Sequence, residues 1–356
     1  MISARLLRSL KREFRESRMA QVGAIILVII FITTAFAPFF APHDPTTQRI
    51  GTGDTEDMSY LPPPVFSTTE NVTVFEDGER VTREVTTEGN WSFVLGTDRH
   101  GRDILSRILY GGRVSLSVGI IGAALAALIG VPWGLAAGYA GGRVDDTLMR
   151  WADVMLAFPS LVLAIALVGI FRGTPFHTRR IPDPFVWAAN TDLIPNVLIP
   201  RANHVAQMPE TVTFPVTVTI VVALVNTVWF ARVARGEAIS VREEDYIKAA
   251  TSMGTGKLTI LRKHVLPNSM TPIIVLATIQ VAAIILLESA LSYLGFSGIS
   301  LSWGQDIQRG QSDLRRGWWM ATMPGLAIVA AVIAVNLVGD WLRDSLDPSI
   351  EGEGGV

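Results

Sequence analysis

Side chains that could support catalysis or hold a metal ion are few in this chain. Its 356 residues include no cysteine, which excludes disulfides, thiolate metal sites and cysteine nucleophiles. The five histidines are scattered, without the short spacing that brings two imidazoles to one metal ion. We therefore expect no catalytic residue, no metal site and no cofactor, and so no enzymatic activity in this chain itself.

One short stretch looks like a phosphate-binding loop. Residues 254–259 read GTGKLT, whereas a P-loop requires a glycine, four residues of any type and then Gly-Lys-Ser/Thr. Thr251 stands at the position of the first glycine, and Leu258 follows Lys257. The segment does not match the motif, so any ATP hydrolysis must come from a separate polypeptide.

Glu288 lies deep inside an apolar stretch, ILLESALSYLG. A charged side chain at such a depth in a membrane is costly, so it should face the interior of a helix bundle or a water-filled cavity, or be protonated. Two interpretations are open. Glu288 is either a residue of a translocation path or a helix-to-helix polar contact, with Ser289, Asn226 or Asn336 as its partner.

Six apolar segments are long enough to cross a membrane. Hydrophobic residues make up 49% of the chain and charged residues only 17%, which is too apolar for an ordinary soluble domain. A helix needs about 20 apolar residues to span the hydrocarbon core, where every backbone amide must find a partner within the protein. We expect six transmembrane helices, at 19–41, 114–138, 151–171, 211–231, 269–295 and 318–339.

The distribution of basic residues predicts the orientation of these helices. Six lysines and arginines precede the first span, and the segment between the fourth and fifth spans is also rich in them. Residues 42–90, in contrast, carry ten acidic residues and only three arginines. By the positive-inside rule, we expect cytoplasmic N- and C-termini, an extracytoplasmic segment at 42–112 and a cytoplasmic loop at 232–268.

The first apolar segment has a second interpretation, a cleaved signal peptide. Its apolar core is longer than the roughly 7–15 residues of such a peptide. The sequence that follows it, APFFAPHDP, offers no clean cleavage site. We therefore interpret residues 19–41 as a membrane anchor that stays in the protein.

Two segments outside the predicted spans look like extracytoplasmic insertions. NVTVFEDGERVTREV alternates polar and β-branched residues around Asp77-Gly78, a dipeptide that suits a tight hairpin turn. This pattern predicts a β-hairpin, with a solvated loop as the alternative. Residues 172–210 show no helical period, and we read them as a lid-like or docking loop or, alternatively, as a tolerated insertion.

Glycines recur every fourth residue along the second predicted span. They are Gly130, Gly134, Gly138 and Gly142. At this spacing they share one helical face, and their lack of side chains lets a neighbouring backbone approach closely. We expect close helix packing along this stripe.

The most informative stretch is the charged, amphipathic segment 230–268, FARVARGEAISVREEDYIKAATSMGTGKLTILRKHVLPN. The pattern predicts one short helix over 245–253, ended by Gly254, and a second that opens at Thr255 or Gly256 and ends at Pro267. A short helix of this kind, lying across the surface of a partner, can transmit a rigid-body push between two proteins.

KAATSMGTGKLTILRKHVLPN is similar to the EAA loop of ABC importer permeases, in which Glu-Ala-Ala precedes a glycine and then Leu-Pro. Five residues fall on this pattern: Ala249, Ala250, Gly254, Leu266 and Pro267. Lys248 stands where the family has glutamate. In the family this loop docks in a cleft of the ATP-hydrolysing subunit. The resemblance therefore implies an ATPase-coupling role for these five residues and for Tyr246, with the contact surface at about 246–256.

Further stretches resemble the dipeptide/oligopeptide/nickel permeases, and most of all the C-type partner of that heterodimer. They are APHDP, LGTDRHGRDILSRILYGGRVSLSVG, GGRVDDTLMRWADVMLAFPSLVLAIAL, ESALSYLGF, SWG and GDWLRDSLDP. The similarity covers about 95–170 and 216–348, in order. The segments 46–92 and 172–212 are longer than those usual in the family.

The resemblance implies an all-α integral membrane protein with the type I fold of ABC importer permeases and a small extracytoplasmic insertion. A permease core at 113–348 would lie between a cytoplasmic basic segment at 1–18 and a cytoplasmic tail at 349–356. The implied function is to form half of the path by which a small solute, most readily a peptide, is imported across a prokaryotic plasma membrane.

The partners that the resemblance implies are two ABC ATPase subunits, a second homologous permease chain and an extracytoplasmic solute-binding protein, with no nucleic acid. A homodimer is the alternative to the heterodimer. Nickel or sugars are alternative cargoes. An ion-gradient-driven secondary transporter is the alternative function, although such a protein would show inverted repeats and several intramembrane charges.

Overall fold

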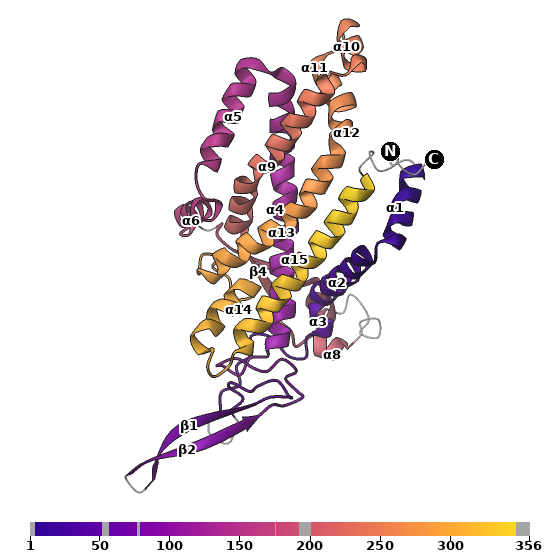
Figure 1. Cartoon of the computed structure of the whole chain (residues 1–356). Coiled ribbons are helices and arrows are strands. Elements are labelled where there is room, and N and C mark those ends of the chain that lie inside the picture. The colour runs from indigo at the N-terminus through magenta and orange to yellow at the C-terminus, as the bar shows by residue number, and fades with distance from the viewer. Residues whose placement is uncertain (1–3, 52–56, 77–78, 175, 192–200, 347–356) are drawn as a thin grey trace.

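The computed structural model describes residues 4–51, 57–76, 79–174, 176–191 and 201–346. These residues form an elongated bundle of helices (Figure 1). One end of the bundle, here called the hairpin end, carries the strands β1 (Ser67–Glu76) and β2 (Glu79–Glu88). The opposite end, here called the loop end, carries the short helices α10 (Asp245–Ser252) and α11 (Lys257–Ile260).

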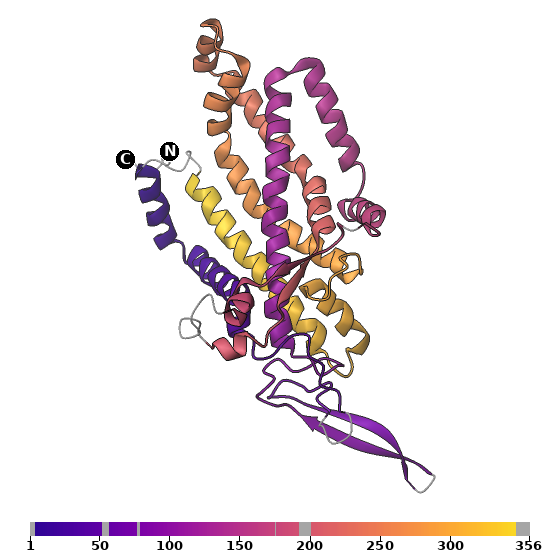
Figure 2. The ribbon, with the colours of Figure 1, turned by 180° about the vertical axis from the view of Figure 1, so that it is seen from behind.

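Five helices are each long and apolar enough to cross a membrane: α2 (Arg18–Ala35), α4 (Ile104–Ala140), α9 (Val216–Arg242), α13 (Met270–Tyr293) and α15 (Trp319–Leu346). A sixth span is formed if α5 (Gly142–Leu156) and α6 (Ser160–Phe171) are taken together. Seen from behind, α4 runs along the middle of the bundle (Figure 2). The helix α1 (Ala4–Glu16) precedes α2, and its Phe14 packs edge-on against Trp341 of α15.

The third predicted span, 151–171, differs from the structure, which bends by 90° between α5 and α6. The proline at 159 disfavours a helical backbone at Phe158, and Pro159 then precedes the first turn of α6. Helix α5 also begins well before residue 151, in a polar stretch that a hydropathy window does not select. The pair is therefore a broken helix and not one straight span.

Helices α4 and α9 approach closely along the predicted glycine stripe. A Cβ atom at Gly130, Gly134 or Gly138 would lie within 3.0 Å of a backbone carbonyl oxygen of α9, closer than real side chains allow. Gly142 lies outside α4 and has open space around it, so the stripe ends at Gly138. This packing aligns the central pair of helices along much of the bundle.

Most predicted spans differ from the structure at one end or both. Helices α9 and α15 run past the predicted ends at 231 and 339, to Arg242 and Leu346. Helix α4 starts at Ile104, ten residues before the predicted 114, because Asp103 caps it by accepting a hydrogen bond from the Ser106 amide. Helix α9 starts at Val216 and not at 211, because 211–214 form a strand. The helix predicted at 19–41 breaks at Phe36, after which the short α3 (Ala37–Phe40) begins.

The predicted β-hairpin is confirmed. Strands β1 and β2 are antiparallel, in a register that pairs Ser67 with Glu88 and Glu76 with Glu79. The predicted turn at Asp77-Gly78 and the predicted tail 349–356 lie outside the described residues. At the base of the hairpin, Phe66 packs edge-on against Trp318 with ring centroids 5.4 Å apart. Trp318 directly precedes α15, so this contact joins the insertion to the N-terminal end of α15.

The second insertion contains regular structure that its sequence did not predict. Strand β3 (Arg179–Pro182) pairs with β4 (Thr211–Phe214), and two short helices lie between them, α7 (Pro184–Asn190) and α8 (Ala202–Val205). Asp183 caps α7 through the amides of Phe185 and Val186. The elements were missed because each is shorter than two helical turns or has too few residues to show a period.

The remaining elements join α11 to α13 and α13 to α15. A π-helical turn (Leu261–Val265) and α12 (Leu266–Asn268) follow α11 directly. Helix α14 (Trp303–Gly310) and a 3₁₀ turn (Gln311–Asp313) lie between α13 and α15 at the hairpin end. Trp303 is buried, and its indole donates a hydrogen bond of 2.9 Å to the carbonyl of Ile108 in α4.

Candidate functional site

Helix α10 has one buried face and one exposed face. Ile247 and Ala250, three residues apart, are 1% and 7% exposed. Tyr246 and Met253 are 44% and 79% exposed, and Ala249 is exposed beside them. Apolar side chains of this size are normally covered in a finished assembly, so the outer face of α10 has the character of a contact surface.

The buried face of α10 belongs to the core at the loop end. Ile247 packs in one cluster with Ile260 and Val265, which follow it in the chain. The same cluster contains Leu135 of α4 and Ala238 of α9. The buried face of α10 therefore belongs to the same packed core as the two central helices at the loop end.

Gly254 makes the turn between α10 and α11 possible. Its φ of +81° lies in the left-handed region that side chains disfavour. With this residue left-handed, the amide of Thr255 returns to the carbonyl of Ala250 at 3.1 Å and closes the end of α10. The prediction that the first short helix ends at Gly254 matches this geometry.

Pro267 distorts the second short helix and does not end it. Proline cannot donate a backbone hydrogen bond and clashes with the preceding turn. The chain accommodates it with the wider π-helical turn at 261–265 and continues through α12 towards α13. Pro267 is exposed and Leu266 is partly buried, and both lie at the start of the fifth span and not on α10.

A hydrogen bond connects the two parts of this loop. The Nδ2 of Asn268 donates to the hydroxyl oxygen of Tyr246 at 3.0 Å, and the ring of His264 lies beside Tyr246 with centroids 6.1 Å apart. Three of the six predicted coupling residues are exposed on or next to α10: Tyr246, Ala249 and Gly254. Ala250 faces inward and supports the surface from behind.

A cavity of about 610 Å³ lies where the broken helix pair meets α9 and α13. Met155, Phe158 and Ser160 line it from the break between α5 and α6. Asn226 and Gln280 add polar side chains from α9 and α13. Non-helical backbone is tolerated inside a membrane where it lines a cavity, and the break between α5 and α6 lines this one.

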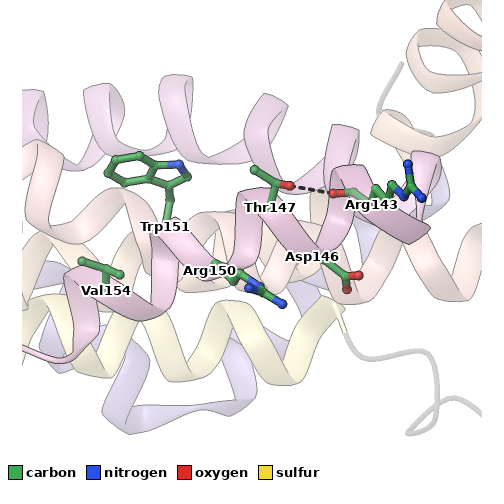
Figure 3. Close-up of a pocket in the computed structure, with 6 residues that line it drawn as sticks. All are labelled: Arg143, Asp146, Thr147, Arg150, Trp151 and Val154. Carbon is green, nitrogen blue, oxygen red and sulfur yellow. Dashed lines mark hydrogen bonds between the residues drawn. The ribbon is translucent and has the colours of Figure 1, made fainter.

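A second cavity, of about 530 Å³, lies along α5 on the loop-end side of the break. Figure 3 shows the six side chains that line it: Arg143, Asp146, Thr147, Arg150, Trp151 and Val154. Met155, the next residue after this set, lines the first cavity. One face of α5 thus continues from charged residues near the loop end to apolar ones at the break.

Ion pairs hold α5 against α9. Arg235 makes two hydrogen bonds to the carboxylate of Asp145, from Nε at 2.5 Å and from Nη2 at 2.6 Å. Nearer the break, Arg232 donates to Asp153 at 2.6 Å. The two-point Arg–carboxylate geometry fixes orientation as well as distance. These ion pairs attach α5 to α9. The C-terminal end of α9 leads directly into α10 at the loop end.

Glu288 is fully buried and surrounded by serine hydroxyls. Ser292, one turn along α13, donates a hydrogen bond of 2.6 Å to its carboxyl. Among the described residues, the buried hydroxyl of Ser115 on α4 has no hydrogen-bond partner. Of the partners expected from the sequence, Ser289 lies 3.5 Å away, whereas the Asn226 amide bonds to the carbonyl of Val222 in its own helix.

A buried ion pair at the hairpin end was not found from the sequence. Arg107 and Asp306, both buried, join the start of α4 to α14, and the Nη1 of Arg107 also donates to the carbonyl of Pro45 at 3.1 Å. The signal that could have indicated it is an arginine within the apolar run ILSRILY. A charge in such a run requires a buried partner.

Comparison with known proteins identifies relatives over nearly the whole chain. Residues 130–352 match the family model described as binding-protein-dependent transport system inner membrane component. Residues 6–63 match the N-terminal transmembrane domain of oligopeptide transport permease C. The first of these matches includes the residues that line the cavities along α5 and at the break, the segment 230–268 and Glu288.

Two curated relatives illustrate the similarity. The di/tripeptide transport system permease protein DppC of Pseudomonas aeruginosa (strain UCBPP-PA14) is 30% identical over 96% of this chain and 91% of its own length. The oligopeptide transport system permease protein OppC of Bacillus subtilis (strain 168) is 30% identical over 95% of this chain and 88% of its own length. Among solved structures, a chain in an inward-facing form of the MetNI methionine ABC transporter is 14% identical to this one, with a TM-score of 0.46. The match covers 68% of this chain and 98% of that chain.

Proposed function

Because this chain belongs to the family of inner membrane components of binding-protein-dependent transport systems, we propose that it is one permease chain of an ATP-driven peptide importer. Its five or six apolar helices make it a multi-pass membrane protein. Relatives that are named as di/tripeptide and oligopeptide permeases support a peptide as the cargo. ATP is bound and hydrolysed by a partner subunit, and this chain uses no cofactor.

The observation that carries the proposal is the two-sided structure of α10. Its exposed face, with Tyr246, Ala249 and Met253, is the surface that an ATPase subunit contacts. Its buried face packs on α9 and α11, in one apolar cluster that also includes Leu135 of α4. When the ATPase subunits close on ATP, they displace α10, and the two central helices move with it as a rigid group.

Half of the translocation path is formed by the face of α5 and the cavity at its break. A second, homologous permease chain supplies the other half, most simply as a heterodimer, and two ATPase subunits bind the two loop ends. The loop end and both termini face the cytoplasm. The hairpin end is extracytoplasmic, where a solute-binding protein delivers the cargo.

Glu288 is a buried polar contact of α13 in this proposal and not a residue of the path. Its carboxyl is fully buried and bonded to Ser292, and the residues that line the two cavities do not include it. The two hydroxyls nearest to it, those of Ser292 and Ser289, both belong to α13 itself. This arrangement counts against the first of the two interpretations of Glu288, a residue of the path.

The proposal is tested by charging the exposed face of the loop. Leu258, in α11 beside α10, is 62% exposed, and Leu314, at the hairpin end, is 52% exposed. Leu258→Glu places an unpaired carboxylate in the contact with the ATPase, which interfaces do not tolerate. We expect this variant to lose most of the ATPase that copurifies with the chain and of ATP-driven dipeptide uptake.

Leu314→Glu is the matched control, with the same change at similar exposure but at the other end of the bundle. It should retain the ATPase subunit at the wild-type level. If Leu258→Glu retains both the ATPase and uptake, α11 and the adjoining face of α10 are not the coupling surface. If the wild-type complex takes up no peptide, the peptide cargo is wrong.

A further inference from the structure

A cleft of about 520 Å³ at the hairpin end has a markedly basic and polar lining. One wall comes from the β3–β4 pair, through Thr178, Arg180 and Thr213. The other wall comes from α14, through Gln305 and Arg309. The segment 298–300, between α13 and α14, completes the lining. The described lining residues include two arginines and no acidic residue.

The local geometry explains why these side chains share the cleft. Arg180 and Thr213 are directly opposite each other in the antiparallel pair, and opposite residues point to the same face. Thr178 lies two residues before Arg180, on the same side of the extended chain. Gln305 and Arg309 are four residues apart, one turn along α14. The sheet face and the helix face therefore meet across the cleft.

The two arginines are short of negative partners. Arg309 lies 4.0 Å from the Oδ1 of Asp306, but that same oxygen accepts the hydrogen bond from the Nε of Arg107 at 2.9 Å. One carboxylate thus serves two guanidinium groups. Burial, and then the charge of Arg107, lower the pKa of Arg309 to about 10, as expected for a cation without its own counter-charge.

Arg180 adds a second uncompensated charge. Among the residues that the structure describes, it has neither a hydrogen-bond nor an ion-pair partner. It is exposed on β3, whereas Arg309 is partly buried on α14. Two guanidinium groups that line opposite walls of one cleft, with threonine hydroxyls in the same lining, can bind one anionic group. Guanidinium groups match carboxylates especially well, because they can donate two parallel hydrogen bonds.

We propose that this cleft binds the C-terminal carboxylate of a peptide at the extracytoplasmic entrance of the translocation path. The inference rests on the proposed function, since it names the part of the peptide cargo that this chain recognises. The volume of about 520 Å³ is within the roughly 300–1,000 Å³ typical of small-ligand sites, so the cleft has room for the last residue of the peptide with its carboxylate. The contact would be made with the backbone terminus that all peptides share, and so it selects no sequence.

The test compares dialanine with its C-terminal amide. Both are titrated calorimetrically into the complete transporter, with its second permease chain and ATPases, in lipid nanodiscs and without soluble binding protein. We expect dialanine to bind about tenfold more tightly than the amide, as for one charge-assisted contact. Arg180→Gln and Arg309→Gln should each remove most of this preference and leave the affinity for the amide unchanged.

Arg179→Gln is the matched control, because Arg179 precedes Arg180 on the same strand but points to the opposite face. It should keep the wild-type preference. Equal binding of dialanine and the amide by the wild type, or a preference that survives both Arg180→Gln and Arg309→Gln, would overturn the inference. In a second titration with the soluble binding protein added, variants that weaken only the docking of that protein would also overturn the inference, because the cleft would then hold an acidic side chain of that protein. Dialanine uptake by the wild-type complex is measured separately, and its absence would instead refute the proposed peptide function.

Discussion

The backbone of Gly254 fixes the direction in which the coupling loop leaves α10. Its φ is +81°, and no atom lies within 4 Å of the place where a Cβ would stand. The effect of a side chain there is thus confined to backbone strain. We expect Gly254→Ala to destabilise the loop by about 1–2 kcal/mol, the usual cost of a left-handed backbone for an L-residue. ATP-driven uptake should fall more than the amount of assembled complex, because the turn would place α10 differently.

Gly256, two residues later, provides the control. Its φ is −61°, which alanine adopts without strain, and the nearest atom to a built Cβ is the Thr259 hydroxyl at 4.0 Å. Gly256→Ala should leave uptake and thermal unfolding of the purified complex close to the wild type. Equal losses from both substitutions would mean that loop flexibility, and not the left-handed turn, accounts for the effect.

Single residues of the site could be predicted from the sequence only in part. Gly254 was identifiable because a glycine after an apolar-periodic helix marks its end. The orientation of Ala250 was not, because the motif gives positions along the chain but not which face of α10 they occupy. Ile247 and Ala250 share the buried face, so a charged residue at 250 would disrupt the packing of the loop itself. Leu258 is the better probe of the outer surface.

At the scale of elements, the proposed mechanism depends on the contact between α4 and α9, which would carry movement at the loop end along the bundle. A Cβ at Gly134 would lie within 3.0 Å of three backbone atoms of Ala231, which cannot move aside as a flexible side chain would. We expect Gly134→Ala to destabilise the protein by about 1–3 kcal/mol, as other overpacking substitutions do. The measurement is the thermal midpoint of the purified complex.

Gly236 offers a comparison within α9 itself. It is exposed, and nothing lies within 4 Å of a Cβ built there. Because alanine favours helix over glycine by about 1 kcal/mol, Gly236→Ala should be neutral or slightly stabilising. A Gly134→Ala midpoint equal to that of Gly236→Ala would show that the two helices separate easily, and the rigid transmission proposed for them would fail.

Element prediction succeeded where hydropathy is uniform and failed where tertiary contacts determine the structure. The long apolar runs of α13 and α15 were recognisable because few polar residues interrupt them. Helix α5 was only partly recognised, because its stability depends on the pairing of Asp145 with Arg235, far away in the chain. Strands β3 and β4 were missed for a similar reason. Each is four residues long and exists by pairing with the other.

The whole molecule has a direction, from the hairpin end to the loop end. The proposed mechanism requires these ends to lie on opposite sides of the membrane, since a cytoplasmic ATPase must reach α10 while a peptide enters beside α14. The hairpin end and the loop end lie at opposite ends of the bundle (Figure 1). The charge distribution predicts which end faces the cytoplasm, and this prediction can be tested directly because the chain has no cysteine.

Single cysteines at Thr86 and Ser252 report on the two ends. Both residues are exposed, Thr86 on β2 of the hairpin and Ser252 at the end of α10. In intact cells, a membrane-impermeant maleimide should label Thr86→Cys, and it should label Ser252→Cys only after the membrane is permeabilised. The parent chain, with no thiol of its own, is the blank for both. Labelling of Ser252→Cys in intact cells would put α10 on the outer surface, where no cytoplasmic ATPase can bind it, and the coupling mechanism would be excluded.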